Sequence, residues 1–449
     1  MNAKIIAIVA VAVVVVAGGA GAFVMMNQNK DPVKVDASLL IMGNADNNAK
    51  IDSGDVDVIK KIINGDEGYT LEKYPLADAN NDKAVNDADV ELVEKMIKHE
   101  EGITINVVCT KTDKKTQYIQ PITYPLKKTV VLGTNLISTH ILVGAAEFIK
   151  GYTKTNYGVA HGSVIDHAEK LGGGIFDMDT DDSVKNFKAL DAKIHLDAVV
   201  TIPSESYLKT SESVVTDAGI PLIRLNSSDG MDSIGGALTI GYIYGEDCEK
   251  IAYKYAEKSY EVLNHITNKV KDIKDEDKKT FVAITMGYYF SEDESDYVGV
   301  GEFAGGKNIC TLKGNGSTKI KDGDEYYKTW RPDYMISFRT LDYTIDYTDI
   351  SKAKPTTLTP KGTWDSYSKY FDMMGDSYKH LIYVNTSMPV ICRMAYIAEI
   401  FYPDLFEDDY GNKVHQEFVN EFMDFLPDGF NVKTDMTVLI TYDSVYPAA

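Results

Sequence analysis

The stretch 246–277 constrains the fold of this chain more than any other, because it contains neither proline nor glycine. Apolar side chains recur along it at spacings of three and four residues, as at Ile251, Tyr255, Val262 and Ile266. This spacing is typical of an amphipathic helix, and about 30 helical residues rise roughly 45 Å, enough to cross a whole domain. Such a helix is either a crossover within one domain or a rigid strut between two lobes.

We favour the strut, because strand-like and helix-like patterns alternate on both sides of this stretch. Before it, β-branched runs such as 127–133 and 197–202 are separated by amphipathic segments, and 280–285 and 380–384 continue the pattern after it. The alternation predicts an α/β fold of sheets flanked by helices. The expected units are an N-terminal lobe at 128–245, the inter-lobe helix at 246–277 and a C-terminal lobe at 278–446.

The composition excludes several classes of function. A formal net charge of −21 and a pI near 4.8 argue against nucleic-acid binding, which needs a basic face. The four cysteines are far apart and form no CxxC motif, so neither a disulfide framework nor a thiolate zinc site is expected. The chain also has no P-loop, GxSxG or HExxH motif, and we expect no enzymatic activity.

Residues 5–26, which follow Lys4, are almost uniformly apolar. A run of about 22 residues is long enough to span a membrane, and the small residues near its end also suit cleavage of a secretory signal. We assign 1–30 to a membrane anchor or a signal peptide, and favour the anchor because of the length. Either assignment predicts an extracytoplasmic protein, anchored at the cell surface or secreted.

Two segments repeat one another at an offset of 34 residues and carry side-chain oxygens at positions 1, 3, 5, 9 and 12 of a loop. Each loop leads into a helical pattern. Alternate oxygens in a tight loop suit a hard cation such as Ca²⁺, with position 7 contributing its carbonyl. The alternative is an Asx-rich turn that caps a helix, but two loops in register favour two calcium ions. The expected ligands are Asn44, Asp46, Asn48, Lys50, Asp52 and Asp55 in the first loop, and Asp78, Asn80, Asp82, Ala84, Asn86 and Asp89 in the second.

This repeat resembles a dockerin, a small all-α module with paired EF-hand-type calcium loops that docks onto cohesin domains. The resemblance covers about 38–102, and we place the module at 36–102. Such loops usually have glycine at position 6, where Ala49 and Lys83 stand here. The resemblance implies a cohesin-like partner. In dockerins, the residues that recognise this partner stand at loop positions 10 and 11 and near the middle of the helix. As an alternative, the module packs against its own chain. Residues 103–127, which follow the module, are expected to form a β-rich junction.

The remainder, from about 124 to 442, resembles the class III solute-binding proteins of ABC importers. The resemblance rests on the order and spacing of several segments: TVVLG, FIKGYT, KALDAKIHLDAVVTIP, DAGIPLIRL and IGYIYGEDCEKIA, then GEFAGGKNI, WRPDYMIS and IAEIFYPDLF. It implies two Rossmann-like lobes joined by a long rigid helix, with a small ligand between them. Siderophores, haem, cobalamin and metals are ligands of this family, and an importer permease is the implied partner.

Residues that follow the expected strands are candidates for the ligand-binding cleft, because open α/β sheets bind ligands beyond the carboxyl ends of their strands. Arginine suits an anionic chelate through its forked donors, and tyrosine adds a flat face and a hydroxyl. Arg393 is expected to reach the ligand from the second turn of the helix 388–402. The candidates are His140, Tyr157, His161, Tyr207, Tyr288, Tyr289, Arg339 and Arg393.

The sequence thus predicts an extracytoplasmic protein that captures a small ligand, such as a siderophore, haem or a related metal complex, for an ABC importer. One alternative is a surface-assembly or adhesive protein that uses the dockerin-like module as its cohesin-type anchor. Another is a protein that binds bare zinc or manganese through His140 and His161.

Overall fold

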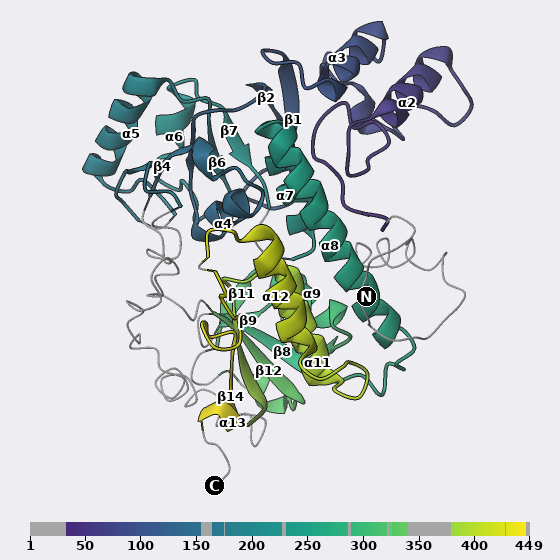
Figure 1. Cartoon of the computed structure of the whole chain (residues 1–449), viewed down its shortest axis with the longest axis vertical. Coiled ribbons are helices and arrows are strands. Elements are labelled where there is room, and N and C mark those ends of the chain that lie inside the picture. The colour runs from purple at the N-terminus through teal and green to yellow at the C-terminus, as the bar shows by residue number, and fades with distance from the viewer. Residues whose placement is uncertain are drawn as a thin grey trace.

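The computed structural model describes residues 33–153, 164–174, 176–226, 230–285, 289–320, 324, 326–339, 379–426 and 428–445. Two α/β lobes lie along one long helix, α8, and a smaller unit of two helices lies beside the first lobe (Figure 1). The expected anchor at 1–30 lies outside the described residues. Among the residues that are described, no helix has both the length and the apolar character needed to cross a membrane.

The first lobe, which we call the N-lobe, is built on a sheet of five parallel strands in the order β5-β4-β3-β6-β7. The short apolar runs of its central strands are fully buried, as expected for a parallel sheet covered on both faces. Its elements are β3 (Thr129–Val131), α4 (Thr134–Leu142), η2 (Ala146–Phe148), β4 (Ile149–Tyr152), β5 (Glu169–Lys170), α5 (Asp181–Ile194), β6 (Ala198–Thr201), α6 (Glu212–Thr216) and β7 (Leu222–Arg224).

The second lobe, the C-lobe, contains a mixed sheet in the order β11-β9-β8-β12-β13-β14, with β10 also paired to β8. Its three central strands, β8, β12 and β13, are parallel, and β9, β11 and β14 add antiparallel edges. Its elements are β8 (Thr280–Thr285), β9 (Tyr289–Ser291), α9 (Asp296–Phe303), β10 (Lys307–Asn308), β11 (Ser317–Lys319), η3 (Tyr326–Thr329), β12 (Tyr334–Arg339), β13 (Leu381–Asn385), α11 (Val390–Phe401), α12 (Tyr410–Phe422), β14 (Leu439–Thr441) and α13 (Tyr442–Val445). The α/β class is therefore confirmed.

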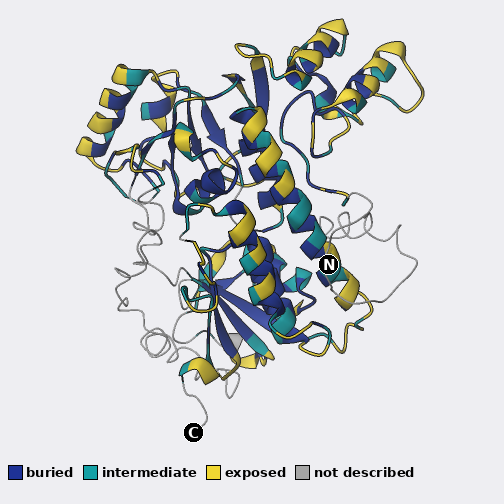
Figure 2. Cartoon of the chain, viewed as in Figure 1, coloured by how far each residue is buried: buried dark blue, intermediate teal, exposed yellow. Residues whose placement is uncertain are grey.

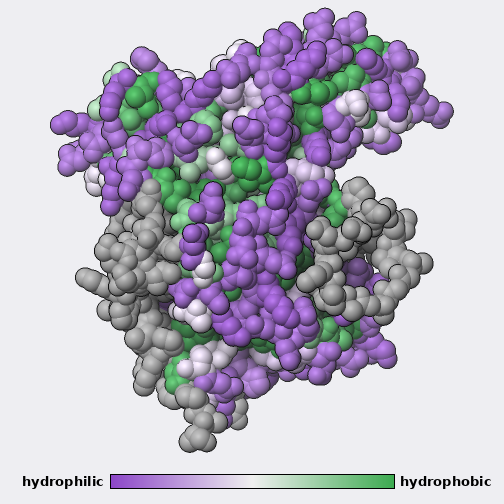
Figure 3. Space-filling model, in the orientation of Figure 1, coloured by the Kyte–Doolittle hydropathy of each residue, from purple (hydrophilic) through white to green (hydrophobic). Residues whose placement is uncertain are grey.

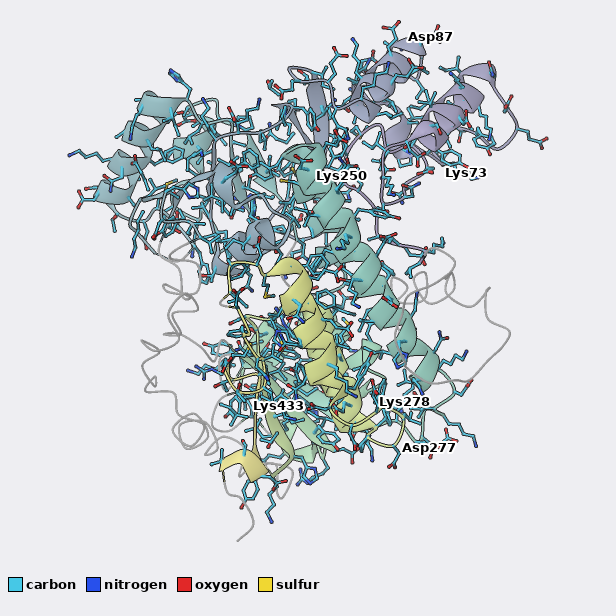
Figure 4. All side chains as sticks on the ribbon, viewed as in Figure 1. Lys73, Asp87, Lys250, Asp277, Lys278 and Lys433 are labelled. Carbon is cyan, nitrogen blue, oxygen red and sulfur yellow. The ribbon has the colours of Figure 1, made fainter. Side chains whose placement is uncertain are left out.

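Helix α8 (Glu246–Val270) is continuous over 25 residues and ends seven residues before the expected boundary. It contacts α4 and α7 of the N-lobe as well as α9, α11 and α12 of the C-lobe. Lys254 lies 2.9 Å from Glu421 of α12, and Lys258 forms an ion pair with Glu417 of the same helix. In Figure 4, Lys250 lies near the first turns of α8, and Lys278 lies beyond its far end. The helix thus packs against both lobes, in the manner of a strut.

Helix α7 (Asp232–Ile243) was not predicted from the sequence, because it has no polar face from which a helical period could be read. Eleven of its residues are buried, and it packs antiparallel to α8. The two helices approach closely at Gly241, where an added Cβ would lie 2.3 Å from the Ala252 Cβ and 2.8 Å from the Cys248 carbonyl oxygen. A glycine at this position is therefore a requirement of packing.

Replacing Gly241 by alanine or valine is expected to lower the free energy of unfolding by about 1–3 kcal/mol, since neither neighbour can move without shifting the backbone. Gly299→Ala in α9 is the matched control, because an added Cβ there meets no atom within 4 Å. That control should be neutral or slightly stabilising. Urea denaturation of both variants checks the prediction, and equal stabilities would contradict the close α7–α8 approach.

Residues 33–102, which we call the loop–helix unit, contain α2 (Ser53–Asn64), η1 (Pro75–Ala77) and α3 (Asp87–Ile97). The following β-rich stretch forms an antiparallel hairpin of β1 (Thr104–Thr110) and β2 (Gln117–Thr123). Five consecutive residues of β1 are buried. Val108 N donates to Leu40 O at 2.9 Å, and Asn106 Nδ2 donates to Ala79 O at 2.9 Å. The hairpin is therefore part of the core beneath the unit.

The loop–helix unit packs directly onto α7 and α8. Tyr242 Oη donates to Met96 O at 3.2 Å, and Leu40 N donates to Thr239 Oγ1 at 2.9 Å. His99 Nε2 lies 3.0 Å from a carboxylate oxygen of Glu249. One continuous hydrophobic cluster extends from Leu39 and Met96 through both helices into the C-lobe, and Figure 2 shows the buried residues that line this junction. The unit is thus docked on its own chain.

Burial of His415 in α12 is expected to make the free energy of unfolding depend on pH. It is 1% exposed, and burial lowers the pKa of its imidazole to about 3. Because the unfolded chain protonates this group near pH 6.5, the stabilisation is complete above that pH and is lost as pH falls toward 3. Between pH 7.5 and pH 5 the contribution of His415 to the free energy of unfolding should fall by about 2 kcal/mol.

The measurement is the difference in unfolding free energy between these two pH values. His415→Phe keeps a buried ring but cannot be protonated, so this variant should lose about 2 kcal/mol less than the wild type over the same interval. His167→Gln, at an exposed position, should behave like the wild type. An identical pH profile for His415→Phe would contradict the prediction.

Candidate functional site

The carboxyl edges of the two sheets face each other. Helix α8 begins beside the amino end of the N-lobe sheet, where Leu126 N donates to Ile243 O at 2.9 Å. The helix ends ahead of the amino end of β8, so its two ends mark the outer edges of both sheets. Beyond β7, Gly230 approaches the Asp296 carboxylate at the start of α9, with an added Cβ only 2.9 Å away. Figure 3 shows hydrophobic atoms gathered between the N-lobe and the hydrophilic helices of the C-lobe.

The N-lobe side of this region carries a pair of aromatic rings. Tyr207, on the loop after β6, packs against Gly133, where an added Cβ would lie 2.7 Å from the ring. Gly133 also has a φ of +107°, which favours glycine. The Tyr207 ring centroid lies 4.6 Å from that of Phe176, and both rings are partly exposed. Tyr207 was predicted from its position after a strand, but Phe176 was missed because no strand pattern precedes it.

The C-lobe side brings Tyr289 and Arg339 to the same sheet edge. Arg339 ends β12 and is in register with Asn385 at the end of β13. Tyr289 begins β9 and pairs with Thr285 at the end of β8, and β8 is the direct neighbour of β12. Both side chains are partly exposed. The parallel pairing of β12 with β8 and the antiparallel pairing of β9 with β8 therefore align these two predicted residues at the edge that faces the N-lobe.

Arg393 is buried, which corrects the expectation that it reaches a ligand. Its side chain is 2% exposed. The guanidinium donates through Nε to Met388 O at 3.0 Å and through Nη2 to Thr386 O at 2.8 Å. It thus bonds the loop between β13 and its own helix, α11, instead of facing the space between the lobes.

His140 also takes a different position from the one expected. It is fully buried in α4, with Nδ1 2.7 Å from Leu136 O and Nε2 3.1 Å from Tyr244 Oη. Burial lowers the pKa of its imidazole to about 4, so the ring stays neutral within the lobe. Both of its ring nitrogens form hydrogen bonds inside the lobe, and we therefore do not include it in the candidate ligand site.

Three further predicted residues, Tyr157, His161 and Tyr288, lie outside the described residues. Among the residues that the structure does describe, no group of three or more His, Cys, Asp or Glu side chains is arranged to hold a metal ion. A site for bare zinc or manganese built on His140 therefore has no support in the described part of the chain.

The two repeated loops of the loop–helix unit form the same hydrogen bonds through their side chains at position 12. The position-12 carboxylate of the first, Asp55, accepts from Asp46 N at 3.1 Å and from Asp52 N at 2.8 Å. In the second loop, Asp89 accepts from Asn80 N at 3.1 Å and from Asn86 N at 2.9 Å. The side chains at positions 3, 5 and 9 accept amides two residues further on in both loops. Both α2 and α3 consequently start with a capping box.

The loops differ at position 1. Asn44 uses its amide to donate to Leu39 O and Asn48 O, both at 2.8 Å. Asp78 instead presents a carboxylate, which accepts from Asp82 N and Lys83 N. Lys83, at the position that glycine usually occupies, takes a φ of +74°, whereas Ala49 shows no positive φ. Both loops therefore contain three carboxylates, but only the second has one at position 1, and it also contains a strained lysine.

Buried carboxylates dominate the electrostatics of both loops. Asp55 and Asp89 are wholly buried. Burial, together with the charges of Asp46 and Asp52, raises the pKa of Asp55 to about 7, although two backbone amides oppose the shift. Burial likewise raises the pKa of Asp89. A bound cation would offset this cost, and the all-oxygen donor set fits a hard cation, although the carboxylates do not converge as a three-ligand cluster.

Solved structures of several solute-binding proteins resemble this arrangement of two α/β lobes on one long helix. Solved structures of that class share the fold of this chain. They include the TroA-like periplasmic binding protein FepB of Veillonella parvula (14% identity, TM-score 0.51, 74% of this chain and 99% of that one) and CeuE of Helicobacter pylori in a Ni-His complex (15%, 0.51, 74% and 99%). A third is an ABC transporter solute-binding protein of Sulfurospirillum deleyianum (13%, 0.51, 73% and 98%). All three are named as binding proteins or as a ligand complex, and none as an enzyme.

At these identities the likeness is one of fold. No protein-family model matches the sequence, and no curated protein is significantly similar to it. The ligand must therefore be inferred from the residues of this chain.

Proposed function

We propose that this protein is an extracytoplasmic solute-binding protein that captures a small metal chelate, such as a ferric siderophore or haem, for an ABC importer. The observation that carries the proposal is the pair of facing sheet edges, with Tyr207 and Phe176 on one side and Tyr289 and Arg339 on the other. Aromatic faces suit a flat organic ligand, and a forked cation suits its negative charge. The permease of the importer is the proposed protein partner.

Native mass spectrometry of the protein isolated from its own source tests the proposal, because a retained chelate would be identified by its mass. Titration with haem and with ferric catecholate and hydroxamate chelates then gives affinities. Arg339→Ala should weaken binding of an anionic chelate about ten- to a hundred-fold. Arg331→Ala is the matched control, since Arg331 is exposed and precedes β12 at the opposite edge. Zinc or manganese bound without an organic ligand would overturn the proposal.

The paired loops are proposed to hold two calcium ions, one in each loop. The matched hydrogen bonds and the wholly buried position-12 carboxylates support this assignment. A cation at each loop would remove the repulsion among three carboxylates in the second loop and among Asp46, Asp52 and Asp55 in the first. The backbone carbonyls of Lys50 and Ala84 would complete each set at position 7.

A dockerin-type interaction is the second candidate function. It is supported by the exposure of Ser53, Asp87, Ala88 and Lys95, which stand at the loop and helix positions that dockerins use for recognition. The unit docks on α7 and α8 through other residues, and this face, which is exposed among the described residues, is proposed to meet a cohesin-like domain or a surface assembly. Calorimetric titration with cohesin domains tests it, with Asp87→Lys as the variant that should abolish binding. No heat with any cohesin would leave the unit as a structural part of the binding protein.

A further inference from the structure

Arginine is rare in this chain, and three of the four arginines lie at or next to the facing edges of the two sheets. Only four of its 46 basic residues are arginines: Arg224, Arg331, Arg339 and Arg393. Arg224 ends β7, Arg339 ends β12, and Arg393 lies on the helix that follows β13. Two of these, Arg224 and Arg393, are only 2% exposed, so their guanidinium groups contact other protein atoms and hardly any solvent.

In the N-lobe, Arg224 bonds both ends of the loop that carries Tyr207. Its Nη1 donates to Ile202 O at 3.2 Å, and its Nη2 donates to Tyr207 O at 3.3 Å. The same Nη2 pairs with the Glu212 carboxylate of α6 at 2.8 Å, which balances the buried charge. The guanidinium therefore ties β7 and α6 to the loop beyond β6.

In the C-lobe, Arg393 makes an equivalent arrangement. It bonds Thr386 O and Met388 O, at the two sides of the short loop between β13 and α11. That loop adjoins the ligand edge, because Thr386 N donates to Arg339 O at 2.8 Å. Ser387 N donates to Asn385 Oδ1 at 2.9 Å in the same turn. Each lobe thus has one buried arginine that bridges two carbonyls of a loop at the facing edge.

Such loops have carbonyls that no strand or helix satisfies, and a buried carbonyl needs a donor. A guanidinium can serve two carbonyls at once from a rigid planar fork, whereas the ammonium group of lysine is a single compact centre. We propose that Arg224 and Arg393 are positioning residues, one in each lobe, which hold the loops 202–208 and 385–389 in the conformation that receives the ligand. The part of this inference that concerns ligand binding rests on the proposed function. The part that concerns the conformation of the loops does not.

Hydrogen–deuterium exchange of the ligand-free full chain tests the loop geometry directly. The reporters are the amides of Tyr207 and Leu208, bonded to Ser204 O and Phe176 O, and the amides of Thr386 and Ser387. In Arg224→Lys the amides of Tyr207 and Leu208 should exchange at least about tenfold faster than in the wild type. In Arg393→Lys the amides of Thr386 and Ser387 should show the same increase. Strands β3 and β6 should keep their protection in both variants. Arg331→Lys is the control, because the Arg331 side chain is exposed although it also donates to two carbonyls.

The result that would overturn the inference is unchanged loop exchange, or a rise that is uniform over the whole lobe, as a loss of global stability alone would give. If a lysine variant fails to fold, Arg224→Gln and Arg393→Gln replace it, since a neutral amide still donates to one carbonyl. Haem titration provides the second readout: both variants should bind about tenfold more weakly at unchanged stoichiometry. Should the wild type bind neither haem nor ferric chelates, the proposed function fails, while the exchange result still decides the positioning role.

Discussion

Removing calcium is expected to lower the melting temperature of the entire chain, and not only that of the loop–helix unit. The unit shares one hydrophobic cluster with α7, α8 and the C-lobe, so its stability is coupled to theirs. For a site with a dissociation constant of about 10 μM, 1 mM calcium stabilises the fold by about 2.7 kcal/mol. Two such sites acting on one cooperative unit would shift the transition by several degrees.

Differential scanning calorimetry with calcium, and then with a chelator, measures this shift. The double variant Asp55→Asn with Asp89→Asn should abolish the response, because it removes the position-12 carboxylate of each loop. Asp57→Asn with Glu94→Gln makes the same change in charge at exposed helix positions and should keep the response. An unchanged wild type would refute calcium binding, and a separate low-temperature transition would refute the shared core.

A proline in the middle of α8 is expected to uncouple the two lobes. Ala256 is wholly buried in this helix, and proline there removes a helical hydrogen bond and clashes with the carbonyl of Ala252, costing about 3 kcal/mol or more. Because α8 contacts helices of both lobes, a kink should change their relative orientation. We expect small-angle scattering of Ala256→Pro to report a larger maximum dimension than that of the wild type.

Glu246→Pro is the control for this experiment, since proline is tolerated at the first helical position. The first intrahelical bond runs from Glu249 N to Gly245 O, so the N–H of Glu246 is not needed. The scattering of this variant should match the wild type. If Ala256→Pro also matches it and unfolds at the same denaturant concentration, α8 is not a strut.

Local periodicity accounts for the parts of the fold that the sequence predicted. The apolar spacing of Ile251, Tyr255 and Val262 indicated α8, and the β-branched runs indicated β3, β6 and β8. Those patterns arise from the 3.6-residue helical repeat and from burial of both faces of a parallel sheet. Helix α7 shows the limit of this approach, because a helix buried on all sides has no contrast between faces.

The candidate site was predictable to the extent that strand order places residues at a sheet edge. Tyr207, Tyr289 and Arg339 follow or end predicted strands, and the structure brings each to a facing edge. Phe176 and Arg224 were missed, since their roles depend on partners such as Tyr207 that lie more than ten residues away. The direction of the His140 ring likewise depends on Tyr244, which lies 104 residues away. The Arg393 side chain instead turns back to carbonyls only five and seven residues away, a contact that helical periodicity does not specify.

By itself, the sequence determined what depends on neighbours within a few residues: the long helix, the buried strands and the repeated loops with their oxygens at fixed positions. Only the tertiary structure decided where those parts meet. The loop–helix unit docks on α7 through a bond such as Tyr242 Oη to Met96 O, between residues 146 apart in the chain. Burial and side-chain direction are properties of contacts across that separation, and no local pattern specifies them.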